Sequence, residues 1–134
     1  MVAKPRNKRW TDQFVIALLL ACIGVTMHYA DLITAAFALN PIRASPDSIA
    51  RGRELFRKNC EACHGQEGQG DGPAASFLRK RPQDLSTIAP PPYFPDGVVA
   101  YRIANGKDVM PAWKGVLTER EIWDLINYIR SLRR

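Results

Sequence analysis

The sequence has 134 residues, and its 19 Lys and Arg outnumber 13 Asp and Glu to give a formal net charge of +6. The basic residues are dispersed along the chain, which argues against a protein that binds nucleic acid. Residues 41–134 carry fifteen Lys and Arg against eleven Asp and Glu, so the charge surplus of this larger part is small.

A basic segment at residues 1–12 precedes an apolar segment at residues 13–39. A continuous helix from Phe14 to Leu39 would be roughly 39 Å long at about 1.5 Å per residue, more than the hydrocarbon layer requires. After the basic residues of segment 1–12, no Lys or Arg follows until Arg43. The positive-inside rule therefore predicts a single transmembrane helix in a lipid bilayer, with a cytoplasmic amino terminus. In a bacterium this is the inner membrane, and the rest of the chain lies in the periplasm.

Three interpretations of this amino-terminal segment remain open. A retained anchor fits its length and the positions of Trp10 and Tyr29, which suit the two membrane interfaces. A cleaved signal peptide would end after Ala38, where the residues have the small-x-small form. A lipoprotein would be modified at Cys22, although the residues after it are hydrophobic.

His28 and Asp31 are three residues apart, so they share a face of the apolar helix. Such a pair can mark the place where the helix enters the lipid headgroups. Alternatively, it can line a path for quinol or protons, or contact a partner subunit. The sequence does not choose between these roles.

A linker at residues 40–47 leads to a domain at residues 48–134. The Ser45-Pro46-Asp47 sequence predicts the start of its first helix, because it combines a capping residue, a first-turn proline and an early acid. Thr118 begins a capping box, and apolar residues at helical spacing follow it to Leu132. Several prolines between residues 82 and 95 exclude long helices and central strands there, and a short helix is expected at 96–104. The predicted fold class is all-α.

Five consecutive residues starting at Cys60 read Cys-Glu-Ala-Cys-His, the pattern of covalent haem attachment. Cys60 and Cys63 can each add to one vinyl group, and His64 can coordinate the iron from one side. A zinc site would need further ligands, and the remaining cysteine and histidine, Cys22 and His28, lie in the apolar segment. A thioredoxin-like dithiol would need alternating strands and helices, which the sequence lacks. We therefore expect one haem c.

Met110 is the single methionine after the amino-terminal segment. A thioether opposite a histidine is the ligand pair of electron-transferring cytochromes c. Elimination makes Met110 the candidate sixth ligand, and the alternative is that it fills a gap in the core. Lys107 is a poor substitute, because an amine must lose its proton before it coordinates iron.

From about Ser48 to Leu132 the sequence resembles a small bacterial class I cytochrome c of the c551 or c552 type. The resemblance rests on residues 52–56, on His64-Gly65 leading into the Gly70–Pro73 string, on residues 106–113 and on residues 122–129. It implies a small cytochrome c fold around the haem, in which the carbonyl of Pro73 accepts the ring N–H of His64. It also implies that Gly52 lets the first and last helices of the domain approach closely, with Phe56 and Tyr128 at the crossing. It implies no catalytic residue.

Two functions remain. A six-coordinate haem would relay single electrons with no small-molecule substrate at the iron, either as a tethered shuttle or as a subunit of a respiratory or photosynthetic complex. An open iron would instead bind small gases or perform peroxidase-like chemistry. Redox protein partners are expected in the first case. Several cations could surround an exposed haem edge and attract an acidic partner, or form an ordinary solvated surface. These cations are Arg79, Lys80, Arg81, Lys107 and Lys114.

Overall fold

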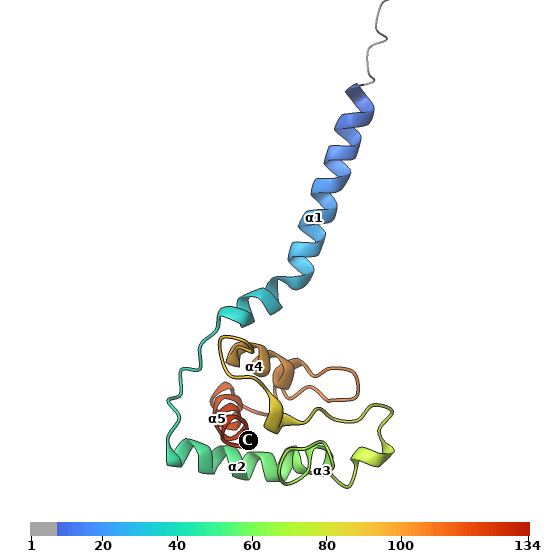
Figure 1. Cartoon of the computed structure of the whole chain (residues 1–134). Helices are drawn as coiled ribbons and strands as arrows, with labels where there is room; N and C mark the ends of the chain where they lie inside the picture. Colours follow the sequence, from blue (N-terminus) through green and yellow to red (C-terminus); the bar gives the residue numbers. More distant parts are fainter. Residues whose placement is uncertain (1–7) are drawn as a thin grey trace, which may run out of the picture. The chain divides into compact units, whose positions relative to one another are not determined.

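A computed structural model describes residues 8–134, and every regular element in this part of the chain is helical (Figure 1). The elements are α1 (Lys8–Phe37), α2 (Pro46–Asn59), α3 (Glu61–His64), the 3₁₀ turns η1 (Ala75–Phe77) and η2 (Leu85–Thr87), α4 (Asp96–Asn105) and α5 (Glu119–Ser131). The predicted all-α fold class is confirmed. Residues 1–7 of the predicted basic segment lie outside the described part.

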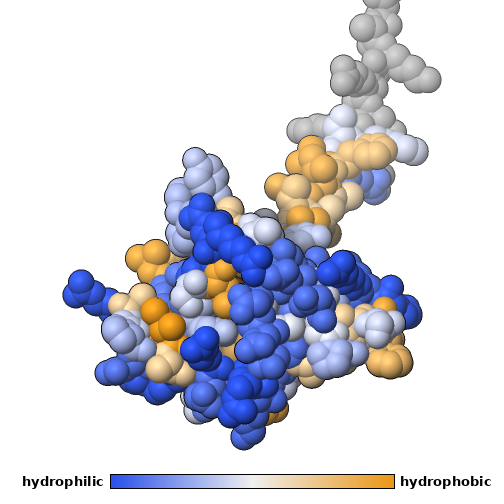
Figure 2. Space-filling view, turned by 60° about the horizontal axis from the view of Figure 1, so that its bottom comes forward, coloured by the Kyte–Doolittle hydropathy of each residue, from blue (hydrophilic) through white to orange (hydrophobic). Residues whose placement is uncertain are grey.

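The chain divides into two compact units, one ending at Thr34 and the other comprising Ala35–Arg134. Within α1, the stretch Trp10–Met27 has a mean hydropathy of 1.7, and by length and composition it can cross a membrane. Its apolar side chains are exposed, whereas the face of the second unit seen in Figure 2 is mostly hydrophilic. Asp31 is also exposed, and the side chain of His28 is not among those described.

Both predicted helix starts in the second unit are confirmed. Ser45 caps α2 with Pro46 as the first helical residue, and the Ser45 hydroxyl accepts a hydrogen bond from the backbone N–H of Ser48. Thr118 caps α5 in the same way, and the Glu121 carboxylate accepts a hydrogen bond from the Thr118 backbone N–H at 2.8 Å. Each cap satisfies backbone donors that have no partner inside the helix, so the sequence fixes where the two helices begin.

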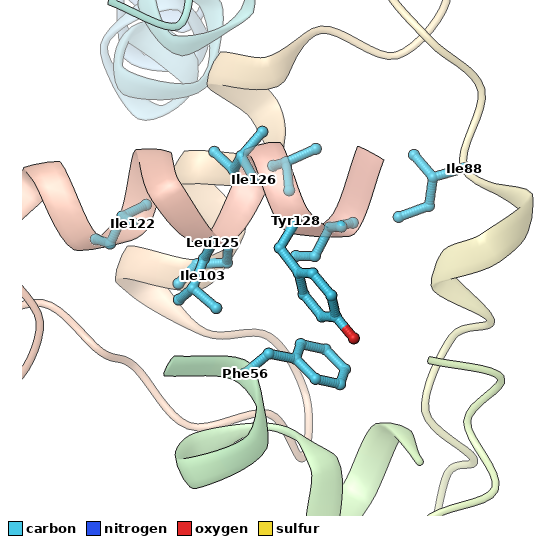
Figure 3. Packing of buried hydrophobic residues seen from close by; sticks show 9 residues of the cluster. Phe56, Ile88, Ile103, Ile122, Leu125, Ile126 and Tyr128 are labelled. Carbon is cyan, nitrogen blue, oxygen red and sulfur yellow. The ribbon is translucent and has the colours of Figure 1, made fainter. Parts of the chain in front are cut away.

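Helices α2 and α5 cross where the resemblance placed the crossing. A Cβ added to Gly52 would meet the backbone of Asp124, so only glycine permits this approach. The ring centroids of Phe56 and Tyr128 lie 5.3 Å apart. Figure 3 shows these two rings close together between α2 and α5. Asp124 is buried at the same crossing, and Arg51 forms two hydrogen bonds with its carboxylate at 2.8 and 3.0 Å. The buried core consists of Phe56, Ile88, Val99, Ile103, Ile122, Leu125, Ile126, Tyr128 and Ile129.

The predicted linker is bound to the domain that follows it. Asn40 donates from Nδ2 to Oδ1 of the buried Asn127 at 2.9 Å, and Asn127 donates from its own Nδ2 to the Ile42 carbonyl at 3.0 Å. Asn127 also donates to the hydroxyl of Ser48 at 3.1 Å. The compact unit therefore begins at Ala35, whereas the sequence placed the start of the domain at Ser48.

One arginine fastens the proline-rich loop to α5. Arg130 forms an ion pair with Asp96 at 2.8 Å and donates to the carbonyls of Ala89 and Phe94 at 2.7 and 2.6 Å. Prolines have no backbone N–H, so this loop can make few backbone hydrogen bonds of its own. The loop is thus ordered by contact with a side chain, and Phe94 is held against the core.

Candidate haem-binding site

A cavity of about 560 Å³ in the second unit is lined by the four residues that the sequence analysis proposed as haem attachments and ligands. Cys60, Cys63 and His64 line it from the α2–α3 side, and Met110 lines it from the loop after α4. Residues 60 and 110 are far apart in the sequence, so the fold brings the two groups to one place. A shallower depression of about 700 Å³ near Asp84 and Arg134 contains none of them.

The backbone positions the Cys-Glu-Ala-Cys-His sequence. Helix α2 ends at Asn59, and the backbone N–H of Cys60 bonds to the carbonyl of Phe56 at 2.8 Å. The N–H of His64 then bonds to the carbonyl of Cys60 at 2.9 Å, which forms the single turn α3. The next loop folds back, since Gly72 donates to the carbonyl of Cys63 at 3.2 Å. The two thiols and the imidazole are therefore held on one short, rigid segment.

The His64 ring is oriented by Gln83. Nδ1 of His64 lies 3.2 Å from the carbonyl oxygen of Gln83. A carbonyl can only accept a hydrogen bond, so Nδ1 carries the proton and Nε2 keeps the lone pair that a metal needs. Burial lowers the pKa of His64, and the hydrogen bond to Gln83 opposes this effect. The imidazole is thus kept neutral, the form that coordinates iron.

The expected role of Pro73 is wrong in this structure. Pro73 is exposed and does not line the cavity, and its neighbour Gly72 packs against the backbone of Ala62. The segment that reaches the ring is instead the one containing Gln83. Two contacts hold that segment: the N–H of Leu85 bonds to the carbonyl of Gly68 at 2.7 Å, and Arg81 donates to the carbonyl of Gly70 at 3.1 Å.

Met110 ends a tight turn after α4. The backbone groups of Lys107 and Met110 bond to each other at 3.1 and 2.9 Å, and Asp108 within the turn has a positive φ of 54°. Gly106, with φ 70°, connects the turn to the end of α4. Such φ values are uncommon for residues other than glycine, and Asp and Asn tolerate them best. The residue types of this turn therefore suit the bend that brings Met110 to the cavity.

The cavity fits a haem in size, lining and chemistry. Its volume lies within the range of about 300–1,000 Å³ that is usual for cofactor sites. Burial raises the pKa of the Cys60 thiol to about 12, which shows that this side of the cavity is an apolar setting. The apolar lining residues are Phe56, Leu78, Leu85, Ile88, Phe94, Val99, Ile103, Val109, Trp113, Leu125 and Ile129.

Three of the five predicted cations, Lys80, Arg81 and Lys107, line the cavity. Arg79 and Lys114 are exposed but do not line it. Arg102 is a further cation in the lining that the sequence analysis missed, since its place on α4 shows no charge cluster. Cations thus outnumber the one acidic lining residue, Asp108, which forms an ion pair with Lys80 at 2.7 Å.

An all-α domain with this cavity and these residues has the features of a class I c-type cytochrome. The family model described as "Cytochrome C oxidase, cbb3-type, subunit III" matches residues 47–129. The chain therefore belongs to this family of c-type cytochromes. As in its relatives, the cofactor is a covalently bound haem c and the activity is electron transfer.

Several relatives are cytochromes c6. The protein from Euglena viridis is 36% identical over 84 residues, covering 60% of this chain and 87% of the relative. The chloroplastic protein from Chlamydomonas reinhardtii is 30% identical over 126 residues, covering 91% and 74%. The protein from Thermosynechococcus vestitus is 30% identical over 92 residues, covering 69% and 76%.

A solved structure also resembles the chain. It is titled the Kuenenia stuttgartiensis reducing HAO-like protein complex, and it superposes with a TM-score of 0.63 at 30% sequence identity. The match covers 70% of this chain and 47% of that one. The chain thus spans about half the length of that protein.

Proposed function

We propose that the protein is a membrane-anchored monohaem cytochrome c that relays single electrons through a six-coordinate haem. The observation that carries this proposal is the gathering of Cys60, Cys63, His64 and Met110 around one largely apolar cavity. In this assignment the two cysteines form the thioether links. His64 and Met110 would hold the iron.

The bound haem c supplies reversible one-electron chemistry at its iron. The chain's own residues set the conditions for this chemistry. The carbonyl of Gln83 fixes the tautomer of His64. The same hydrogen bond raises the basicity of the imidazole, so its free nitrogen gives its electron pair more readily to a metal. A methionine thioether opposite a histidine raises the reduction potential of a haem, so Met110 in this place would favour the reduced iron. The aliphatic and aromatic walls exclude water, so electron transfer would require little solvent reorganisation.

The ligand assignment is tested by the spectrum of the reduced protein with and without carbon monoxide. We expect the wild-type spectrum to be low-spin and unchanged by the gas, because Met110 occupies the sixth position. Met110→Ala should bind carbon monoxide readily, and Lys107→Ala serves as the control for the other candidate ligand. Rapid binding of the gas by the wild-type protein would support the open-site function instead.

We propose that α1 is a retained anchor which places the amino terminus in the cytoplasm and the haem domain in the periplasm. The support is an exposed apolar helix of sufficient length, preceded by the basic residues of the amino terminus. Mass spectrometry of the haem-staining protein from native membranes tests this proposal. The intact chain would support an anchor, whereas a chain beginning after Ala38 or a lipid on Cys22 would identify one of the other two processing routes.

We propose that the redox partner presents an acidic surface to the cavity mouth. Lys80, Arg81, Arg102 and Lys107 lie in the lining against one carboxylate, and such a field mainly raises the association rate. Extraction of native membranes with a mild detergent would identify the partner, through the size and neighbours of the haem-staining species. A large assembly would mean a permanent subunit, and a monomer would mean a shuttle with transient partners.

A further inference from the structure

We propose that the ion pair between Lys80 and Asp108 is a clasp across the cavity mouth that positions Met110, and that it thereby sets how easily the sixth coordination position opens. This inference rests on the proposed ligation of iron by Met110. It gives Lys80 and Asp108 a positioning role for the electron-transfer site.

The clasp joins two segments that reach the cavity from different parts of the fold. Nζ of Lys80 lies 2.7 Å from Oδ2 of Asp108, and both residues line the cavity. Lys80 precedes the segment whose Gln83 carbonyl orients His64. Asp108 lies two residues before Met110 in the tight turn. A single ion pair therefore links the supports of both proposed axial ligands.

The turn carrying Met110 has few other attachments. The hydrogen bonds between Lys107 and Met110 lie within the turn itself, and Gly106 connects it to α4 at one end. At the other end, the backbone N–H groups of Trp113 and Lys114 bond to carbonyls at the end of α4. Among residues 8–134, the bond from Lys80 is the one side-chain hydrogen bond or ion pair that joins residues 107–110 to another segment. Without that bond, the turn would be held mainly by α4 and by packing of the Met110 side chain.

The residue type at position 108 suits this role. A left-handed φ is adopted readily by glycine, asparagine and aspartate. Of these three, only aspartate also offers a charge to Lys80. The bond from Nζ of Lys80 to Oδ2 of Asp108 at 2.7 Å joins a cation to a carboxylate, and such charge-assisted hydrogen bonds are stronger than neutral ones.

The expected effect is moderate, because the side chains of Lys80 and Asp108 are 67% and 45% exposed. Exposed ion pairs change an equilibrium by about 1.5- to 5-fold. We therefore expect loss of the clasp to raise the affinity of an external ligand for the iron by that factor. The methionine bond itself should remain dominant, so the variants should stay low-spin in the absence of added ligand.

The test is a titration of the full-length, haem-bearing ferric protein with imidazole in mild detergent, followed by the absorption spectrum. Lys80→Met and Asp108→Asn should each increase the apparent affinity about 1.5- to 5-fold, and the double variant should show no further increase. Lys80→Arg keeps the positive charge, so it should retain the wild-type affinity for imidazole. Arg79→Gln removes a neighbouring exposed cation that does not line the cavity, so it should leave the affinity unchanged.

Independent, additive effects of Lys80→Met and Asp108→Asn would overturn the clasp, as would an equal effect of Arg79→Gln or no effect at all. A parallel titration of Met110→Ala separates this failure from failure of the proposed ligation. If Met110→Ala binds imidazole much more tightly than wild type while the clasp variants do not, only the clasp is wrong. If Met110→Ala and wild type bind it equally, Met110 is not a ligand and both proposals fail.

Discussion

Replacing Asn127 with leucine is predicted to release the connector at residues 38–45 from the haem domain. Asn127 is buried on α5, and its side chain makes two hydrogen bonds to the connector, with Asn40 and Ile42, and a third to Ser48 in the first turn of α2. Leucine has a similar size but no polar atoms, so it removes these bonds without leaving a large cavity. The backbone fold of α5 should be unaffected, since leucine is a good helix former.

The free-energy cost of Asn127→Leu follows from the hydrogen bonds that remain after the substitution. Ser48 keeps its bonds to Ser45, and Asn40 can still donate to the carbonyl of Trp123 at 3.3 Å. The carbonyl of Ile42 loses its donor. An unsatisfied, partly buried carbonyl costs about 1–3 kcal/mol, and we take about 2 kcal/mol as the cost of docking lost. This corresponds to about a 30-fold increase in the fraction of molecules with an open connector.

Trypsin provides the assay, because Arg43 is exposed within the connector. When opening and closing are fast, the cleavage rate follows the open population. Mass spectrometry of the full-length protein in detergent should therefore show cleavage after Arg43 rising about 30-fold in Asn127→Leu. Asn105→Leu is the matched control, because the exposed Asn105 bonds only within its own helix, to Tyr101. A change below about fivefold would refute the proposed role of Asn127, since it corresponds to only about 1 kcal/mol.

Three further predictions concern α5 and its contacts, each measured by unfolding of the haem-bearing protein. Gly52→Ala should lower the free energy of unfolding by about 1–3 kcal/mol despite a better helix propensity, because the added Cβ meets the α5 backbone. Unchanged stability would mean that α2 and α5 can move apart at little energetic cost. Arg130→Met should lose about 2–4 kcal/mol, since it leaves Asp96 unpaired at 19% exposure. The control Arg57→Met breaks an exposed ion pair and should leave the stability nearly unchanged. Hydrogen bonds to Thr118 lower the pKa of Glu121, so its stabilising effect is complete above about pH 4.5 and is lost as the pH falls through the lower folded value. Glu121→Gln should therefore lose less stability than wild type between pH 5 and 3, and an equal loss would contradict this assignment.

Local signals in the sequence predicted much of the fold and the site. The caps at Ser45 and Thr118 are short patterns with a fixed geometry, so the helix starts could be predicted from a few residues. The Cys60–His64 sequence likewise needs only one helical turn to bring its three side chains together. Met110 was found by elimination, because it is the one methionine beyond the amino-terminal segment.

Contacts between distant loops could not be predicted in the same way. The partner of His64 depends on the path of an irregular loop, and no periodicity indicates that Gln83, and not Pro73, reaches the ring. The bond between Asn40 and Asn127 joins residues 87 positions apart. The one available signal was a polar residue, Asn127, within the apolar face of α5, which indicates a buried hydrogen-bond partner without identifying it.

The bound connector also bears on how far an anchored haem domain could reach. Eight free residues, 38–45, could extend about 27 Å at about 3.4 Å each, enough to allow a shuttle to move between neighbouring complexes. Hydrogen bonds to Asn127, together with the packing of Ala35 and Ala38 against Gly97 of α4, remove most of this reach. A protein anchored by α1 would then serve a partner held close to it in the membrane. Asn127→Leu releases the part of the connector that Asn127 holds and does not alter the cavity lining. Electron transfer to a fixed partner should then become slower, because the haem is held near that partner less of the time. An unchanged rate would indicate a partner that meets the haem domain by diffusion.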